Sequence, residues 1–256
     1  MILKILGSVS PYPKADNNCV GYLIYDTDSK QKILLDCGNG ITRLMSFPND
    51  LENLTIIISH LHKDHYADLS AIAYASYVYH NLGLLNSKIK VYIPNSKDLE
   101  DYHYLINYGT EHYMNFYVYS EKTRLNINDI NISFYKAQHN IKTFAMNIIK
   151  ENVKISYSAD TGYTENISSF FQNANILICE SSFLKHQKNG NINHLSAEEA
   201  ATIAKKSNAK KLILSHFWPE IDKSNYLNEA KNMFENVDVA LENKEYILKN
   251  YICKKR

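Results

Sequence analysis

The densest group of chemically capable residues is one six-residue segment, His-Leu-His-Lys-Asp-His. It carries four metal-ligating side chains: His60, His62, Asp64 and His65. A helix does not bring residues two apart onto one face, so this spacing favours the end of a strand that runs into a loop. Imidazole and carboxylate ligands together suit zinc, with iron and manganese as the alternatives. The segment therefore predicts a metal site rather than an ordinary polar loop.

Further ligand-type residues stand at the ends of apolar, strand-like runs. Three such runs end in His139, Asp160 and His216, and another ends in Glu180. Taken alone, Asp160 is typical of a turn, and either histidine is typical of a structural role. In open α/β sheets, however, sites form just beyond the carboxyl ends of the strands. We therefore expect these side chains to meet the His60 segment at one edge of a sheet.

The remaining pattern predicts a layered α/β fold that positions these strand ends. Strand-like runs open the chain, and strands then alternate with helices. The expected strands cover residues 2–6, 20–25, 32–36, 54–59, 89–93, 154–158, 176–179 and 211–215, with several more between 111 and 150. The expected helices cover residues 41–46, 69–82, 96–106 (capped by Ser96), 165–171, 197–207 and 224–234. No linker or short-period repeat divides the chain, so residues 1–256 are expected to form one domain.

Composition limits the classes of partner and location. Lys plus Arg (28) and Asp plus Glu (27) nearly cancel, so neither long nucleic acid nor an anionic membrane is an expected partner. No apolar run is long enough to span a bilayer, and the N-terminal one is too short for a signal peptide. The cysteines (Cys19, Cys37, Cys179 and Cys253) lack metal or disulfide spacing and are expected to be buried thiols. A cytoplasmic protein with a solvated basic tail at 254–256 is expected.

The segment Ser-His-Leu-His-Lys-Asp-His resembles the His-x-His-x-Asp-His signature of the metallo-β-lactamase superfamily. The resemblance covers nearly the whole chain and implies a four-layer αββα sandwich with the site at one edge. Leu-Leu-Asp-Cys-Gly-Asn-Gly, which contains Asp36, looks like the family's early Asp-Gly turn, whose Asp supports the first metal ligands.

The same resemblance implies two divalent metal ions per chain, expected to be Zn²⁺, with Mn²⁺ or Fe²⁺ as alternatives. The first metal would take His60, His62 and His139 as ligands. The second would take Asp64, His65 and His216, and Asp160 would bridge the two. A hydroxide held between the metals is the expected nucleophile.

A second pair of motifs narrows the reaction. Glu180-Ser-Ser-Phe and His194-Leu-Ser-Ala-Glu-Glu-Ala resemble motifs of the RNase Z-like branch, in which a Glu steadies a His beside the leaving group. Cleaving a phosphodiester requires a nucleophile, charge stabilisation at phosphorus and a proton for the departing oxygen. The expected catalytic residues are Asp64, Glu180 and His194. Ser196 and Glu199 predict a capping box that would fix the loop presenting His194.

Other features depart from that branch. The chain has no glycine-rich basic insertion like the arm that grips tRNA, and only Arg43 and Arg124 precede the C-terminal arginine. We therefore expect a phosphodiesterase that acts on a small or short substrate, as a homodimer by analogy with the branch. A lactone or thioester hydrolase and a tRNA 3′-processing endonuclease remain as alternatives. The tyrosines between residues 74 and 119 are expected mostly in a half-buried core or at a subunit contact, with a few lining the cleft.

Overall fold

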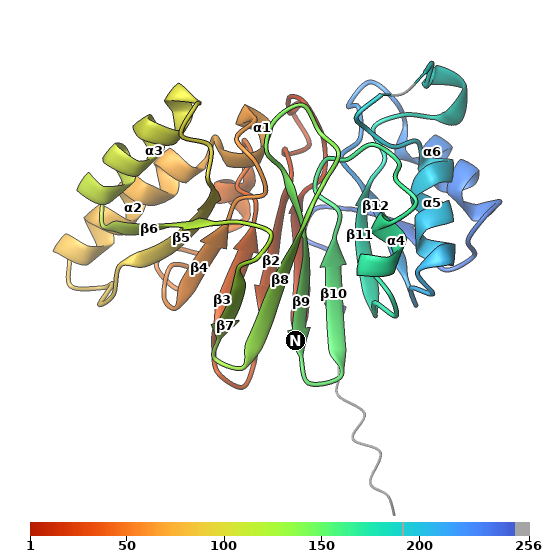
Figure 1. The fold of residues 1–256 in the computed structure, drawn as a ribbon. Coiled ribbons are helices and arrows are strands. Elements are labelled where there is room, and N and C mark those ends of the chain that lie inside the picture. The colour runs from red at the N-terminus through yellow and green to blue at the C-terminus, as the bar shows by residue number, and fades with distance from the viewer. Residues whose placement is uncertain (191, 249–256) are drawn as a thin grey trace, which may run out of the picture.

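The computed structural model describes residues 1–190 and 192–248. Two seven-stranded sheets lie face to face, and helices cover the outer face of each sheet (Figure 1). This is the four-layer αββα sandwich that the sequence predicts, and the fold prediction is confirmed. The predicted basic tail at 254–256 and Cys253 lie outside the described residues. Within the described ranges, no helix has the length and apolarity needed to cross a bilayer.

The two sheets have matching strand orders. In sheet order, the first contains β14 (Glu245–Ile247), β1 (Ile2–Gly7), β2 (Gly21–Tyr25), β3 (Lys32–Leu35), β4 (Leu54–Ile57), β5 (Ile89–Pro94) and β6 (Met114–Tyr119). The second contains β13 (Val237–Val239), β12 (Leu212–Ser215), β11 (Ile176–Glu180), β10 (Val153–Tyr157), β9 (Phe144–Lys150), β8 (Ile130–Lys136) and β7 (Arg124–Ile127). Strands β3 to β6 run parallel, as do β10 to β13, so their carboxyl ends share an edge within each sheet.

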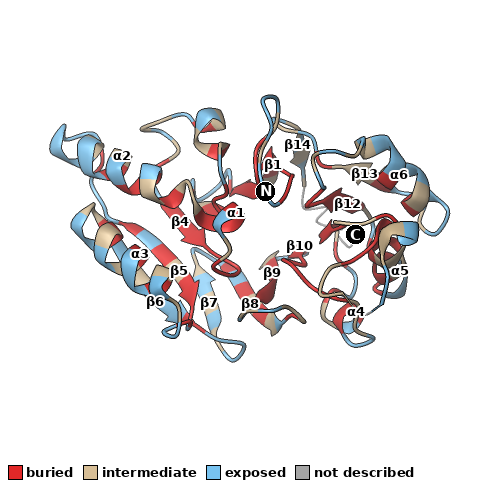
Figure 2. Ribbon diagram, turned by 90° about the horizontal axis from the view of Figure 1, so that it is seen from above, coloured by how far each residue is buried: buried red, intermediate tan, exposed pale blue. Residues whose placement is uncertain are grey.

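The helices form the two outer layers. The first sheet carries η1 (Ile41–Leu44), α1 (Lys63–Tyr66), α2 (Leu69–Asn81) and α3 (Glu100–Glu111). The second carries α4 (Ile167–Phe170), η2 (Lys185–Gln187), α5 (Ala197–Lys206) and α6 (Lys223–Lys231). Figure 2 looks onto the edge that holds α1, with α2 and α3 on one side and α4, α5 and α6 on the other. The strand ends that were expected to carry the site open onto this edge.

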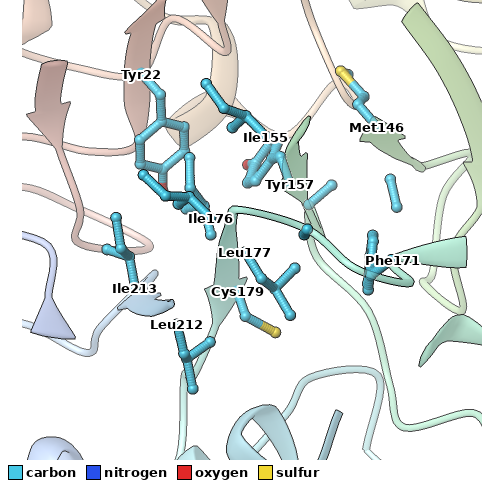
Figure 3. Close-up of a cluster of buried hydrophobic side chains, with 14 of the residues drawn as sticks. Tyr22, Met146, Ile155, Tyr157, Phe171, Ile176, Leu177, Cys179, Leu212 and Ile213 are labelled. Atoms are coloured by element: carbon cyan, nitrogen blue, oxygen red, sulfur yellow. The ribbon is translucent and has the colours of Figure 1, made fainter. Parts of the chain in front are cut away.

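The core follows from the two-residue period of the strands. Side chains at alternate positions point to opposite faces of a sheet, and in β3 this places Ile33 and Leu35 between the sheets but Leu34 under the helices. All three side chains are fully buried. Figure 3 shows the core between the sheets, where Tyr22 and Tyr157 lie side by side with ring centroids 5.1 Å apart. The Tyr157 hydroxyl donates to Asp36 (2.6 Å), and the Tyr22 hydroxyl lies 2.6 Å from the hydroxyl of Ser215, which precedes His216 in the chain.

One local prediction was wrong, and two short strands were missed. The helix expected from Ser96 begins at Glu100, because residues 96–99 form a turn closed by the Leu99 N–H donating to the Ser96 carbonyl (2.9 Å). The Ser96 hydroxyl is buried and caps nothing. The short strands β13 and β14, which close one edge of each sheet, were not predicted. Their few residues carry too little periodicity to be recognised without their partner strands.

The cysteines and tyrosines separate into buried and exposed groups. Cys19, Cys37 and Cys179 are free, buried thiols, as predicted. Of the tyrosines between 74 and 119, Tyr102 and Tyr119 are buried, whereas Tyr74, Tyr77, Tyr104 and Tyr117 are exposed. Their rings lie mainly on the outer helices α2 and α3 and on β6. The remaining four are half-buried, so most of the set is at least half-buried, and the expected subunit contact stays a prediction.

Candidate metal centre and catalytic pair

The seven predicted metal ligands come together at the functional edge. His60 and His62 follow β4, Asp64 and His65 lie in α1, and the remaining ligands follow three strands of the other sheet: His139 after β8, Asp160 after β10 and His216 after β12. The strand ends thus bring residues up to 156 positions apart (60 to 216) to one place. They form two groups, each with ligand atoms within 4.8 Å of one another: His60, His62, His139 and Asp160, and Asp64, His65 and His216.

Asp160 lies between the two groups. Its Oδ2 is 3.5 Å from Nε2 of His60 and 3.7 Å from Nε2 of His139. Its Oδ1 faces the other way, 3.3 Å from Nε2 of His65 and 3.0 Å from Nε2 of His216. Oδ1 is buried and accepts no hydrogen bond, which is a costly state for a carboxylate oxygen. One oxygen toward each group is the arrangement of a carboxylate that bridges two cations.

The histidine nitrogens that face the centre include pairs in close contact. His62 Nδ1 lies 3.0 Å from His60 Nε2 and 3.1 Å from His139 Nε2. Burial lowers the pKa of His60 to about 3 and also lowers the pKa of His62 and His139. These imidazoles are therefore neutral at pH 7, with lone pairs available for a cation. Three converging imidazoles and a carboxylate match the ligands that zinc prefers.

The second group has a different electrostatic balance. Burial alone would lower the pKa of His65, but the carboxylates of Asp160 and Asp64 raise it well above its usual range. Against the same effect of burial, Asp160 and Asp64 raise the pKa of His216 to about 10. The pKa of Asp64 lies well below its ordinary value: burial would raise it, but His65 and His216 lower it. Buried carboxylates thus require positive charge here, and a divalent cation would supply it in place of two imidazole protons.

Asp36 orients the ligands on the first-sheet side. Its buried carboxylate accepts hydrogen bonds from the Ser59 N–H (2.6 Å), the Ser59 hydroxyl (2.7 Å), the Tyr157 hydroxyl (2.6 Å) and His65 Nδ1 (2.8 Å). Because the Ser59 hydroxyl donates to Asp36, it can accept from Nδ1 of His60 at 3.0 Å. One carboxylate therefore fixes His65 directly and His60 through a serine, leaving both Nε2 atoms directed at the centre.

Glu180 orients two histidines on the second-sheet side, as Asp36 does on the first. Its Oε1 lies 2.9 Å from Nδ1 of His194, and its Oε2 accepts from the Ser182 hydroxyl at 2.9 Å. That hydroxyl lies 2.8 Å from Nδ1 of His216. The carboxylate thus fixes His194 directly and His216 through a serine. The backbone N–H groups of Thr161 and Leu195 also donate to Glu180, at 2.7 and 3.0 Å, so its position is well determined.

His194 is presented at the start of α5. The predicted capping box is confirmed: the Glu199 N–H donates to the Ser196 hydroxyl (3.2 Å), and the Ser196 N–H donates to the Glu199 carboxylate (2.8 Å). Burial would lower the pKa of His194, but Glu180 raises it above its usual value. The side chain keeps 25% of its surface exposed. A histidine that is oriented by a carboxylate and still reaches solvent is suited to donate a proton to a bound substrate.

Several contact residues of the centre were not predicted. Ser10 donates to Oδ2 of Asp64 at 2.7 Å, and Tyr157, Ser59 and Ser182 hold the carboxylates and histidines described above. Nδ1 of His139 lies 3.2 Å from the carbonyl of Asn193. Ser59 and Ser182 stand within two positions of His60 and Glu180, whereas the contacts of Ser10 and Tyr157 depend on the packing of distant segments.

The comparisons with known proteins agree with this geometry. The Beta-lactamase superfamily domain matches residues 31–217. A probable metallo-hydrolase of Bacillus subtilis, YhfI, is 28% identical over 94% of this chain and 97% of its own length. Its crystal structure superposes with a TM-score of 0.88, covering 96% of this chain and 98% of that one. A ribonuclease Z of Clostridium perfringens is 34% identical over 39% of this chain and 33% of its own length.

More distant structures share the fold. Human short-form tRNase Z superposes with a TM-score of 0.74 at 19% identity, covering 98% of this chain and all of the other. A diphosphatase of the PhnP family superposes with a TM-score of 0.73 at 14% identity, covering 97% of this chain and 98% of the other. The sequence match, the sandwich and the paired His and Asp groups lead to one conclusion. The chain belongs to the β-lactamase superfamily and is a metallo-hydrolase with clusters suited to divalent metal ions.

Proposed function

We propose that this protein is a phosphodiesterase with two metal ions, in which His194 protonates the leaving group. The observation that carries the proposal is the contact of His194 with Glu180 beside both ligand groups. Hydrolysis of a thioester, which releases a thiolate, has less need of a separate proton donor on this side. A diester that releases an alkoxide has a strong need for one.

The distances between these side chains support the proposed ligand roles. His60, His62 and His139 would hold one ion, Asp64, His65 and His216 the other, and Asp160 would share one oxygen with each. Zinc fits this set of nitrogen and oxygen ligands best, with manganese or iron as alternatives. Two bound divalent cations would supply a nucleophilic water at neutral pH and positive charge beside the phosphoryl oxygens.

The protein's own residues supply orientation and the proton. The water oxygen forms a bond to phosphorus, the bond from phosphorus to the leaving oxygen breaks, and His194 gives its proton to that oxygen. The products are a phosphomonoester and an alcohol, and His194 regains a proton from solvent. Glu180 fixes the orientation of the His194 imidazole by accepting a hydrogen bond from Nδ1, which leaves Nε2 as the proton donor. Asp64 is held in place by the Ser10 hydroxyl.

The expected substrate is small or short. Strands β9 and β10 are joined by a two-residue turn, since Lys150 pairs directly with Val153. No arm that could grip a tRNA is therefore inserted between these two strands. The near-neutral charge also removes most of the counterion-release contribution that long nucleic acids provide. We accordingly propose that precursor tRNA is a poor substrate. The homodimer and the cytoplasmic location stay predictions.

The test is leaving-group dependence in the His194→Ala variant. With the zinc- or manganese-loaded protein, this change should cost on the order of a hundredfold or more in turnover of an alkyl diester. It should cost far less with bis-p-nitrophenyl phosphate, because nitrophenolate departs without a proton. His186→Ala, which removes an exposed histidine eight residues away, is the matched control.

The same assay separates the alternatives. Metal content must be measured in parallel, because His194 also lies within ligand distance of Asp160 and His216. Loss of a metal ion in His194→Ala would make His194 a ligand rather than a proton donor. Equal losses on both diesters with metal retained would indicate a structural role at the start of α5. Good turnover of a lactone or thioester, or of precursor tRNA at physiological salt, with little turnover of small diesters would contradict the proposal.

A further inference from the structure

A pocket of about 460 Å³ opens beside His194 and His216. Three aromatic side chains line it: Tyr12, Phe183 and Trp218. None of the tyrosines between residues 74 and 119, all of them described, lines this pocket, although some were expected to line the cleft. Ligand pockets in proteins commonly measure about 300–1,000 Å³ and combine apolar walls with a few placed polar groups. This pocket has both properties, and the candidate proton donor is part of its wall.

The aromatic walls are held by backbone pairing between distant segments. The Phe217 N–H donates to the Ser8 carbonyl, and the Ser10 N–H donates to the Phe217 carbonyl, both at 2.9 Å. These bonds place Tyr12 and Trp218 on two adjoining segments, and the Tyr12 hydroxyl also donates to Glu220 at 3.3 Å. The backbone on this side of the pocket is therefore held by hydrogen bonds within the protein.

Phe183 is positioned by a similar pairing on the His194 side. Its N–H donates to the Leu195 carbonyl (3.2 Å), and its carbonyl accepts from the Ala197 N–H (3.0 Å). The Phe183 ring lies 6.4 Å from the His194 ring, centroid to centroid. The segment that presents the proton donor thus also carries one wall of the pocket.

The pocket is suited to a neutral, planar group. None of its eight lining residues is Asp, Glu, Lys or Arg. The hydroxyls of Ser10 and Ser182 in its wall already donate to Asp64 and Glu180. Trp218 and Tyr12 remain 43% and 45% exposed, so their rings are available for contact. A charged extension of the substrate, such as a further phosphate, would find no Lys or Arg among these eight residues.

We infer that this pocket receives the leaving group of the diester, and that the leaving group is a nucleoside whose base stacks on Trp218. The inference rests on the proposed phosphodiesterase function. The pocket adjoins His194, and the group next to the proton donor is the one that departs. A nucleoside is planar at the base, carries no charge at neutral pH and bears the hydroxyl that takes the proton. Aromatic side chains bind bases by stacking without regard to sequence.

Two matched diesters test the inference in the metal-loaded protein. Adenosine 5′-(methyl phosphate) and glycerol 1-(methyl phosphate) both release a primary alcohol, so their leaving oxygens need similar protonation. The adenosine diester should be the better substrate and should yield adenosine and methyl phosphate. Release of methanol and adenosine 5′-monophosphate instead would place the nucleoside on the other side of phosphorus and overturn the inference. Faster turnover of benzyl methyl phosphate than of the adenosine diester would overturn the assignment to a nucleoside.

Substitutions of the aromatic walls should act selectively. Trp218→Ala should lower kcat/KM for the adenosine diester on the order of tenfold or more, mainly through KM. The glycerol diester should change less than about twofold, since it makes no stacking contact. Tyr104→Ala, which removes a comparably exposed ring from α3, is the matched control. Equal losses on both diesters in Trp218→Ala, with metal content retained, would refute base stacking.

Direct binding separates this inference from the proposed function. Trp218 is the only tryptophan in the chain, so intrinsic tryptophan fluorescence reports on the pocket alone. Adenosine should quench this fluorescence in the metal-loaded protein, and Tyr12→Ala and Phe183→Ala should weaken the binding. Quenching without hydrolysis of any diester supports the pocket but contradicts the phosphodiesterase. Hydrolysis of both diesters at equal rates without quenching supports the phosphodiesterase and overturns the pocket.

Discussion

Asp36 provides a strong test of how the centre is held, because its carboxylate accepts four hydrogen bonds in the buried interior. In Asp36→Ala, the Ser59 N–H, the Tyr157 hydroxyl and His65 Nδ1 lose their shared acceptor. A buried donor left without a partner costs about 1–3 kcal/mol. Three of them give a loss of about 3 kcal/mol or more, against a total stability of about 5–15 kcal/mol for a typical protein.

The same change should weaken metal binding. Without Asp36, nothing fixes the tautomer of His65 or the serine that orients His60. Residues of this kind typically contribute 10- to 100-fold to metal affinity. Urea unfolding of the metal-free protein gives the stability change, and competition with a chelator gives the zinc affinity. Asp98→Ala, an exposed aspartate before α3, is the control.

An Asp36→Ala variant whose unfolding free energy lies within about 1 kcal/mol of the wild-type value, and which binds zinc as tightly, would contradict this role of Asp36. Should Asp36→Ala fail to fold, Tyr157→Phe removes a single donor to the same carboxylate and should cost about 1.5–3 kcal/mol. Ser59→Ala is the complementary variant. It breaks the link between Asp36 and His60 and should weaken zinc binding more than it weakens the metal-free fold.

Two further outcomes are expected. Elemental analysis of the saturated protein should give two metal equivalents per chain. Asp160→Ala should lose at least one of them, because Asp160 directs one oxygen to each group. One equivalent in the wild type and no change in Asp160→Ala would contradict the shared site. Burial alone would raise the pKa of Asp26, but hydrogen bonds from Lys150 (2.7 Å) and Ser29 lower it below its ordinary value. Its stabilising contribution is therefore present above about pH 4 and lost as the pH falls through the lowered pKa. Asp26→Asn should flatten the decline in unfolding free energy of the metal-free protein below pH 4, and an unchanged slope would show that this pair is not responsible.

The sequence by itself determined the local parts of this protein. The His-x-His-x-Asp-His segment, the strands that end in ligands and the capping box before α5 all depend on residues within a few positions of one another. Strand and helix periodicity also predicted a layered α/β fold, because each face that must be buried is marked by its own repeat, and the family resemblance implied the sandwich of two facing sheets. The resemblance of these motifs to the family's implied the two sets of ligands that the structure brings together.

Only the tertiary structure decided which distant groups support the centre. Tyr157 reaches Asp36 across 121 positions, and nothing in either segment indicates that contact. The aromatic pocket is a stronger case, since Tyr12 and Trp218 are brought together by backbone pairing between residues 8–10 and 217. The fold thereby makes Trp218 a wall of this pocket beside His194. Periodicity records which face of an element is buried, but the identity of the partner that buries it is set by how all the layers pack together.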